Sequence, residues 1–324
     1  MSMKGDRKPV AFIEDCAVSL EHLADYTARL KEIFKKYGTS GMFYAHASVG
    51  TLHVRPVLNM KSDKDIQNMR SISEEAFEMV KDYKGSHSGE HGDGIVRSEF
   101  HEMMFGKKIT NAFEEIKDTF DSKNLLNPGK IVRPFKSNDR SLMRYKSGYQ
   151  TENIDTHYDW SNWGQFSDAV EMCNNNGACR KLDSGVMCPS YRVTKEEKDL
   201  VRGRANTLRL ALSNQLPEGS FASKEMYETM ELCVSCKACQ RECPMSVDMA
   251  KMKSEFLSHY YKKFSMRIKD RIISDMPRLI WLLKFVAPIF NKIKNIPLIS
   301  TIVEKFGFAT ARTMPEVQNQ NALR

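Results

Sequence analysis

The chain has 324 residues, 41% of them hydrophobic and 28% charged, so it can form one large domain or two of ordinary size and is neither disordered nor fibrous. The excess of basic residues behind its formal net charge of +8 is confined to residues 251–312, which hold 13 Lys and Arg against four Asp and Glu. This confinement argues against a nucleic-acid-binding protein. The absence of any apolar run near 20 residues and of an apolar leader excludes an ordinary transmembrane helix and a secretory signal, so the cytosol is the expected compartment.

Residues 9–134 mix strand and helix patterns. The short apolar run at 10–13 predicts a buried strand, and Ser19 is a candidate cap for a helix through Tyr37. The elements expected next are two strands within 42–57, a helix over 63–83, a glycine-rich loop over 85–94 and a helical stretch over 99–120. This order predicts an α+β unit, in which an antiparallel sheet carries helices on one face.

The rest of the chain is expected to be helical. Residues 135–167 lack steady periodicity and are interpreted as a connector, whereas 168–261 predict an all-α ferredoxin-like domain. Its expected helices cover 196–213, 223–232 and 246–261. Residues 262–324 form a basic amphipathic segment broken by Pro277, Pro288 and Pro297. Its apolar stretch at 278–290 is expected to pack against other helices of a larger enzyme, with an anionic membrane surface as the alternative.

Seven of the eight cysteines lie between residues 173 and 243. In a chain without an export signal, such clustering predicts metal binding rather than disulfides. Cys233, Cys236, Cys239 and Cys243-Pro have the C-x2-C-x2-C-x3-C-P spacing of bacterial ferredoxins. Zinc sites usually show two separated C-x2-C pairs, so this spacing favours an iron–sulfur cluster. The remaining cysteine, Cys16, is expected to be a small core residue without a role.

A second, altered cysteine motif precedes the first. Cys173 and Cys179, followed by Cys188-Pro, fit the same frame if Asn176 occupies the position of the missing cysteine. In two-cluster proteins, the cysteine before the proline binds the other cluster. This exchange predicts one complete 4Fe–4S set, formed by Cys188, Cys233, Cys236 and Cys239. The other set, Cys173, Cys179 and Cys243, lacks a ligand and is expected to hold a 3Fe–4S cluster, a 4Fe–4S cluster with a non-cysteine ligand, or nothing, its thiols then being buried apolar groups.

Histidines flank the predicted hairpin. A turn centred between Val49 and Gly50 would place His46 directly opposite His53, close enough for the two imidazoles to share one cation. The glycine-rich loop leaves Glu90 and His91 at its apex. Two histidines and a carboxylate are a recognised ligand set for a divalent metal such as zinc or manganese. The sequence therefore predicts a metal and substrate site formed by His46, His53 and Glu90.

These motifs, in this order, resemble a known arrangement. Residues 9–134 resemble the C-terminal, substrate-side domain of FAD-linked oxidases of the vanillyl-alcohol oxidase type, in the branch of the D-lactate and D-2-hydroxyglutarate dehydrogenases. The motifs that carry this resemblance are His46…Gly50-Thr-Leu-His53, Ser88-Gly-Glu-His-Gly92 and Asn127-Pro-Gly-Lys130. Residues 173–257 resemble the helical ferredoxin domain of large bacterial FAD and Fe–S dehydrogenases, a pattern to which 187–192 and 202–205 belong.

The resemblance implies oxidation of a D-2-hydroxy acid. It implies FAD as the hydride acceptor, and clusters that pass single electrons to an external quinone, cytochrome or flavoprotein. The residues matching His46, His53 and Glu90 would hold the metal that binds the substrate. The residue matching His91 would be the general base.

Two further sets of residues have expected roles. The turn that contains Asn127 and Lys130 would lie against the flavin. Arg55, Arg97 and Arg133 are candidates to pair with a second substrate carboxylate, which suits 2-hydroxyglutarate better than lactate.

The chain also departs from the family. The family's turn usually reads Gly-Asp-Gly-Asn-Leu-His, whereas this one reads Ser48-Val-Gly-Thr-Leu-His53. No flavin-binding segment is present, so we expect an internal fragment of a longer enzyme that binds FAD poorly and turns over slowly by itself. The alternatives are a non-catalytic iron–sulfur subunit that docks a flavoprotein, and a zinc-stabilised structural protein. The expected location is cytoplasmic, with peripheral attachment at the inner membrane face as the alternative.

Overall fold

The structure is a computed structural model that describes residues 3–294, 296–309, 311 and 315–318. The chain divides into two compact units, Met1–Glu255 and Phe256–Arg324, which are described separately below. Within the described residues, no helix combines the length and the apolar character needed to cross a membrane. The finer domain boundaries expected at residues 134 and 168 stay predictions.

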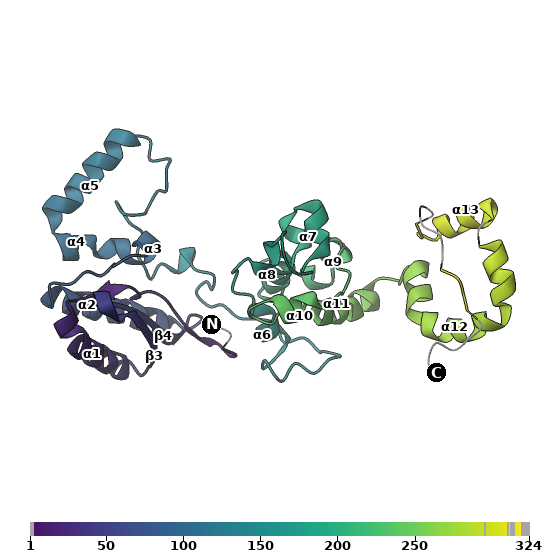
Figure 1. The fold of residues 1–324 in the computed structure, drawn as a ribbon, viewed down its shortest axis with the longest axis horizontal. Helices are drawn as coiled ribbons and strands as arrows, with labels where there is room; N and C mark the ends of the chain where they lie inside the picture. Colours follow the sequence, from purple (N-terminus) through teal and green to yellow (C-terminus); the bar gives the residue numbers. More distant parts are fainter. Residues whose placement is uncertain (1–2, 295, 310, 312–314, 319–324) are drawn as a thin grey trace. The chain divides into compact units, whose positions relative to one another are not determined.

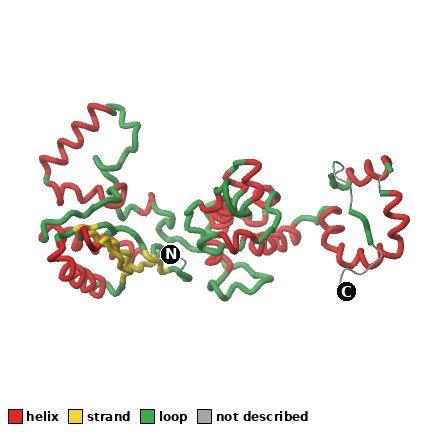
Figure 2. Tube along the Cα trace, in the orientation of Figure 1, coloured by secondary structure: helices red, strands yellow, loops and turns green. Residues whose placement is uncertain are grey.

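A small antiparallel sheet lies in the N-terminal part of the first unit (Figures 1 and 2). Its central strand is β4 (Thr51–Asn59), which pairs with β3 (Gly41–His46) along one edge. The short strands β1 (Arg7–Pro9) and β2 (Cys16–Ala17) pair with opposite ends of β4. The predicted fold class is confirmed: an α+β region with an antiparallel sheet is followed by a helical region.

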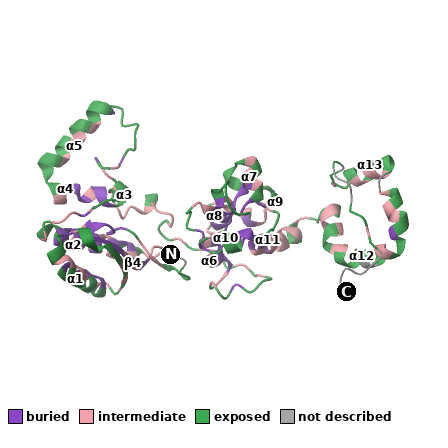
Figure 3. Ribbon diagram, viewed as in Figure 1, coloured by how far each residue is buried: buried purple, intermediate pink, exposed green. Residues whose placement is uncertain are grey.

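Two long helices, α1 (Leu23–Lys36) and α2 (Asp63–Asp82), lie side by side over one face of this sheet (Figure 1). Side chains of a strand alternate between the two faces, and Leu52, Val54 and Leu58 of β4 point into the core beneath these helices. The buried residues of α2 and β4 form much of this core (Figure 3). His53 and Arg55 therefore lie on the other face of the sheet, where the candidate site is built.

Two sequence predictions for this region are wrong. No strand forms at 10–13: after β1 the chain bends, and Phe12 and Ile13 enter the core from an irregular segment. The helical stretch expected over 99–120 is split into α4 (His101–Phe105) and α5 (Lys107–Phe120). The split occurs at Gly106, whose φ of 79° is a conformation that favours glycine.

The cysteine-rich region of the first unit is helical, as predicted. Its elements are α6 (Phe166–Glu171), α7 (Pro189–Thr194), α8 (Val201–Leu212), α9 (Lys224–Glu231), α10 (Ala238–Glu242) and α11 (Met249–Lys263), which runs past the boundary of the unit. The fully buried Glu255 accepts hydrogen bonds from the backbone of His157 and Tyr158 and from Nε1 of Trp160, at 2.9–3.0 Å. These bonds fix the segment before α6 to α11.

Shorter helical elements connect these pieces. They are α3 (Gly94–Arg97) and the 3-10 turns η1 (Leu20–His22), η2 (Ala47–Val49), η3 (Ser98–Phe100), η4 (Arg140–Leu142), η5 (Ala178–Arg180), η6 (Glu197–Asp199) and η7 (Ser220–Ala222). The predicted helix from Ser19 thus begins as a 3-10 turn, and that from residue 196 begins as η6 before α8.

The second unit contains α12 (Ile268–Ile293) and α13 (Pro297–Lys305). The breaks predicted at Pro277 and Pro288 are wrong, because α12 continues through both residues, whereas Pro297 begins α13 as expected. Large apolar side chains of α12 are exposed, among them Ile280, Leu282, Phe285 and Ile289.

Candidate active site and cluster pocket

The hairpin between β3 and β4 has a different register from the predicted one. His46 pairs with Thr51 and Tyr44 with His53, so the expected direct pairing of His46 with His53 is wrong. The cause is the turn, in which η2 is closed by Gly50 with a φ of 71°. A Cβ at Gly50 would lie 1.9 Å from the carbonyl oxygen of Val18, which only glycine avoids.

The two imidazoles nevertheless converge, because positions two apart along a strand share a face. The rings of His46 and His53 have centroids 5.0 Å apart. Glu90 Oε1 lies 3.2 Å from Nε2 of His46, 3.2 Å from Nε2 of His53 and 3.5 Å from Nε2 of His91. The structure thus brings all four residues of the predicted site around one carboxylate oxygen.

This donor set fits a divalent cation. His53 is buried, its Nδ1 has no hydrogen-bond partner among the described residues, and its Nε2 faces Glu90. His46 and Glu90 are about half exposed, at 58% and 48% of their side chains, so the site opens to one side. Imidazole nitrogens and a carboxylate with an open position are what a catalytic zinc-like site offers.

Glu14 is a residue of this site that sequence reasoning missed. Its Oε1 lies 3.7 Å from Nδ1 of His53 and 3.6 Å from Nδ1 of His91. Burial opposes its ionisation, but hydrogen bonds from Arg55 and Tyr44 hold the pKa of Glu14 below its usual range. Glu14 therefore stays a carboxylate that can orient both rings. It lies in an irregular segment without a motif, so no local pattern marks it.

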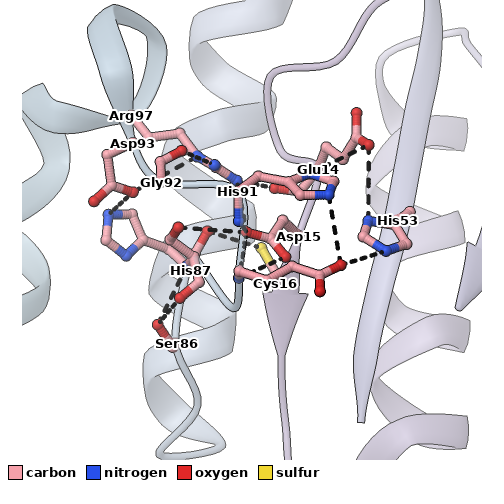
Figure 4. A network of polar contacts seen from close by, with 12 residues as sticks. Glu14, Asp15, Cys16, His53, Ser86, His87, His91, Gly92, Asp93 and Arg97 are labelled. Atoms are coloured by element: carbon pink, nitrogen blue, oxygen red, sulfur yellow. Dashed lines mark hydrogen bonds and ion pairs between the residues drawn. The ribbon is translucent and has the colours of Figure 1, made fainter. Parts of the chain in front are cut away.

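Asp15, also missed, holds the glycine-rich loop in place (Figure 4). Its carboxylate accepts the backbone N–H groups of Glu90, at 2.9 and 3.0 Å, and of His91, at 2.7 Å. Its own carbonyl accepts the N–H of Gly89. Burial opposes ionisation, but these backbone donors and Arg97 lower the pKa of Asp15. The positions of Glu90 and His91 thus depend on a buried carboxylate.

The three candidate arginines are all engaged with protein carboxylates. Arg55 makes a bidentate contact with Glu14, at 3.0 and 3.1 Å, on the open side of the sheet. Arg97 is 6% exposed, contacts Asp15 and Asp93, and donates to the carbonyl oxygens of Glu14 and Gly92. Arg133 pairs with Asp118 at 2.6 Å. Among the three, Arg55 is the one placed beside the imidazoles.

The turn predicted to face the flavin lies at the surface. Lys130 Nζ donates to Oδ1 of Asn127 at 3.2 Å, and Asn127 has a left-handed φ of 48°. Both residues line a surface pocket together with apolar side chains and with the start of α3; the lining includes Gly94, Phe113, Ile116, Leu126 and Ile131. An apolar, accessible pocket with a basic residue at its rim is compatible with an aromatic, anionic cofactor such as a flavin nucleotide.

The four cysteines of the predicted complete set line one pocket, although Cys188 is distant in sequence from Cys233, Cys236 and Cys239. The N–H of Val201 lies 3.2 Å from Sγ of Cys188, and the N–H groups of Met249 and Ala250 point to Cys239. Burial raises the pKa of the Cys188 thiol to about 12 and that of Cys239 to about 11. Four thiols with backbone N–H donors fit a 4Fe–4S cluster.

The second cysteine set is less complete. Burial raises the pKa of Cys173 and of Cys179, with smaller contributions from Cys243 to the first and from Cys173 to the second. The three thiols are therefore within electrostatic reach of one another. Asn176 is exposed, and its side chain bonds to Asn174 and to the N–H of Ala178.

Comparison with known families gives a separate match for the sheet region and for the cysteine-rich region. Residues 1–131 match the family described as FAD linked oxidases, C-terminal domain, and residues 169–247 match the 4Fe-4S dicluster domain. The chain thus contains one region that matches each of these two families. The resemblance inferred from the motifs is confirmed, and FAD and a 4Fe–4S cluster are the cofactors that the two families support.

Several curated proteins are similar to all or part of this chain. The D-2-hydroxyglutarate dehydrogenase of Escherichia coli (strain K12) is 30% identical over 93% of this chain and 33% of its own length. That of Pantoea ananatis (strain AJ13355) is 31% identical over 89% of this chain and 31% of its own length. The D-lactate dehydrogenase of Archaeoglobus fulgidus is 33% identical over 41% of this chain and 29% of its own length. The chain thus spans about a third of the length of these relatives.

Proposed function

We propose that this chain supplies the substrate-side and electron-transfer parts of an FAD- and Fe–S-dependent dehydrogenase of D-2-hydroxy acids. The observation that supports this most is the convergence of His46, His53 and His91 on one oxygen of Glu90. This convergence lies within a domain of the FAD-linked oxidase type. The relatives named for D-2-hydroxyglutarate and D-lactate give the substrate class.

His46, His53 and Glu90 would hold a divalent cation, zinc or manganese, at the open face of the sheet. A cation held there would supply Lewis-acid polarisation of the substrate hydroxyl, FAD would supply a hydride acceptor for C2, and the clusters would supply a route for single electrons to an external acceptor. The product is the corresponding 2-oxo acid.

His91 is the proposed general base that takes the hydroxyl proton. Its Nδ1 lies 3.6 Å from Glu14 Oε1, and its ring stacks on that of His53, with centroids 4.8 Å apart. Glu14 would orient the ring and stabilise the imidazolium that forms after proton transfer, as a carboxylate does for a catalytic histidine. Glu14 is in this sense a positioning residue, because it acts through His91.

Arg55 is the proposed partner of a second substrate carboxylate. Its Nε and Nη2 bond to Glu14, while Nη1 has no hydrogen-bond partner among the described residues. A guanidinium already oriented by one carboxylate can donate hydrogen bonds to a second carboxylate from its free edge. This favours 2-hydroxyglutarate over lactate, whereas the burial of Arg97 suits a structural role.

Cys188, Cys233, Cys236 and Cys239 are the proposed ligands of a 4Fe–4S cluster. Cys173, Cys179 and Cys243 would hold a second cluster, of the 3Fe–4S type or with a non-cysteine fourth ligand. Electron paramagnetic resonance distinguishes these cases, because an oxidised 3Fe–4S cluster is paramagnetic whereas an oxidised 4Fe–4S cluster of the ferredoxin type is not.

A variant of His91 tests the proposed activity against a non-catalytic electron-transfer subunit. The full chain, with clusters in place, is combined with the flavin-binding region of a relative, and oxidation of D-2-hydroxyglutarate and D-lactate is followed with an artificial acceptor. His91→Ala should lower kcat by about 10²–10⁴-fold, the usual contribution of general-base catalysis, with unchanged iron content. The control is His22→Ala, at a histidine outside the site whose side chain is 45% exposed. Oxidation that survives His91→Ala would instead support the subunit that only docks a flavoprotein.

A further inference from the structure

A second group of metal-ligating side chains shares no residue with the site around Glu90. His87 and Asp93 belong to the glycine-rich loop, and His101 is the first residue of α4. One ligand atom from each of the three lies within 4.8 Å of the others. The two histidines are buried, at 0% and 4% exposure. Figure 4 shows His87 and Asp93 at the left of the view and His53 at the right.

The separations between these atoms suit a shared cation. Nε2 of His101 lies 2.8 Å from Oδ2 of Asp93, and Nε2 of His87 lies 3.4 Å from Oδ1 of the same carboxylate. A zinc-like ion bound at about 2.1 Å in tetrahedral geometry holds its ligand atoms roughly 3–3.5 Å apart. Small side-chain adjustments would therefore be enough for coordination.

The hydrogen bonds of His101 point the same way. Its Nδ1 lies 3.2 Å from the carbonyl oxygen of Ile131, which can only accept, so Nδ1 carries the hydrogen. In a neutral ring, the lone pair of Nε2 then faces a carboxylate oxygen of Asp93, and two acceptors at 2.8 Å need a cation or a proton between them. A backbone carbonyl that holds the distal nitrogen is also the usual support of a metal-bound histidine.

His87 gives separate support for a bound cation, because its buried ring nitrogens lack hydrogen-bond partners in the part of the chain that the structure describes. Its side chain is fully buried, and neither ring nitrogen has a hydrogen-bond partner among the described residues. Oδ1 of Asp93, the atom that His87 faces, also has no hydrogen-bond partner there. Buried polar atoms are rarely left without partners, and one bound cation would satisfy both atoms at once.

We propose that His87, Asp93 and His101 bind one divalent cation of the zinc class, a site separate from the substrate site. Two imidazoles and one carboxylate are a known protein ligand set for such ions. The rings of Phe77, Phe105 and Phe113 pack against the two histidines, which limits competing water. Arg97, whose Nε lies 3.6 Å from Oδ1 of Asp93, carries a positive charge that would repel the ion. The carboxylate of Asp15, 3.8 Å from Nη1 of Arg97, balances that charge.

Such an ion would be structural. It would tie the loop that carries Glu90 and His91 to α4, in addition to the backbone contacts that Asp15 makes with this loop. The inference does not depend on the proposed substrate site, because the two sites can be emptied separately.

The test counts metal ions in the full chain. The clusters are reconstituted anaerobically, the protein is equilibrated with zinc and freed of excess, and zinc and iron are measured together by mass spectrometry. The wild-type chain should hold about two zinc ions, and His46→Ala and Asp93→Asn about one each. The double variant should hold none, and the control His22→Ala should hold two. Asp93→Asn offers an amide N–H donor to the lone pair on Nε2 of His101, and circular dichroism checks its fold.

The outcomes separate the two sites. One zinc ion in the wild-type chain, lost in His46→Ala, would overturn the inference and would show that a proton bridges His101 and Asp93. One zinc ion kept in His46→Ala and lost in Asp93→Asn would support the inference and contradict the proposed substrate metal. If Asp93→Asn does not fold, the comparison of the wild-type chain with His46→Ala still tests the inference. A site formed by His87, Asp93 and His101 predicts that His46→Ala keeps one zinc ion.

Discussion

Asp15 determines where Glu90 and His91 lie, although it takes no part in the proposed chemistry. It accepts hydrogen bonds from both of their N–H groups from a position 75 residues earlier in the sequence. Its left-handed φ of 82° and its complete burial show how closely the surrounding chain is built around it. At this scale, the site depends as much on a positioning carboxylate as on the residues that would touch the substrate.

Asp15→Asn should destabilise the loop that Asp15 holds. The amide keeps one acceptor but loses the charge and the second oxygen, so buried N–H donors are left without a partner. We expect the free energy of unfolding to fall by about 1–3 kcal/mol and divalent-cation affinity to weaken. Urea unfolding and zinc titration of the full chain measure both. Asp183→Asn, at an exposed carboxylate, is the control; equal effects of the two substitutions would refute the role of Asp15.

Replacing a single cysteine tests whether it is a ligand of the proposed cluster. Cys236→Ala removes a proposed cluster ligand that is exposed, so the variant should fold yet lose about four iron atoms per chain. Cys16→Ala is the control for stability, because it removes a thiol that is fully buried in the core of the sheet region and is not a proposed cluster ligand. Iron and acid-labile sulfide measure the loss. An iron content that fell equally in both variants would mean that instability, and not a missing ligand, releases the cluster.

At the scale of elements, groupings that a motif marks were predictable, whereas strand register and contacts without a motif were not. The cysteine motifs predicted the pocket that Cys188 shares with the later cysteines, and the predicted hairpin and the glycine-rich loop led to His46, His53, Glu90 and His91. The register of β3 on β4 depends on the close approach of Gly50 to Val18, which no local pattern reveals. Glu14 and Asp15 were missed for the same reason, since their partners lie far along the chain.

A partly buried charge cluster connects the end of β4 with α6. Lys61, just after the strand, lies 2.7 Å from Asp6, 2.7 Å from Glu171 and 3.9 Å from Asp168. Burial opposes its charge, but Glu171 and Asp6 outweigh burial and raise the pKa of Lys61. The ammonium group is therefore charged at neutral pH and balances three carboxylates.

Lys61→Met should leave these carboxylates without a counter-charge. We expect a loss of about 1–3 kcal/mol in the free energy of unfolding of the first unit, less than for a fully buried ion pair, because Asp6 is exposed and screened by solvent. Urea unfolding monitored by tryptophan fluorescence reports the change. Lys64→Met, at an exposed lysine nearby in α2, should change it little. A similar small effect at Lys61 would show that the cluster contributes nothing to stability.

At the scale of the whole molecule, the two units differ in their surfaces and in their matches to known families. The first unit contains both regions that match known families, whereas the second exposes apolar side chains of α12 beside the basic residues Arg278, Lys284 and Lys292. We expect this apolar surface to pack against protein rather than lipid.

Vesicle sedimentation tests that expectation. The full chain should remain in the supernatant both with vesicles that contain anionic lipids and with neutral vesicles. Binding to anionic vesicles alone that weakens as salt is raised would contradict packing and support attachment at a membrane surface.

The central claim is that the clustered cysteines hold iron and sulfide that carry electrons away from a hydroxy-acid site. The most direct test is the metal content of the wild-type chain after anaerobic expression and purification. The account predicts at least about four iron atoms with equal acid-labile sulfide per chain, and broad absorption near about 400 nm that bleaches on reduction. Zinc bound to the cysteines, with neither iron nor sulfide, would contradict it.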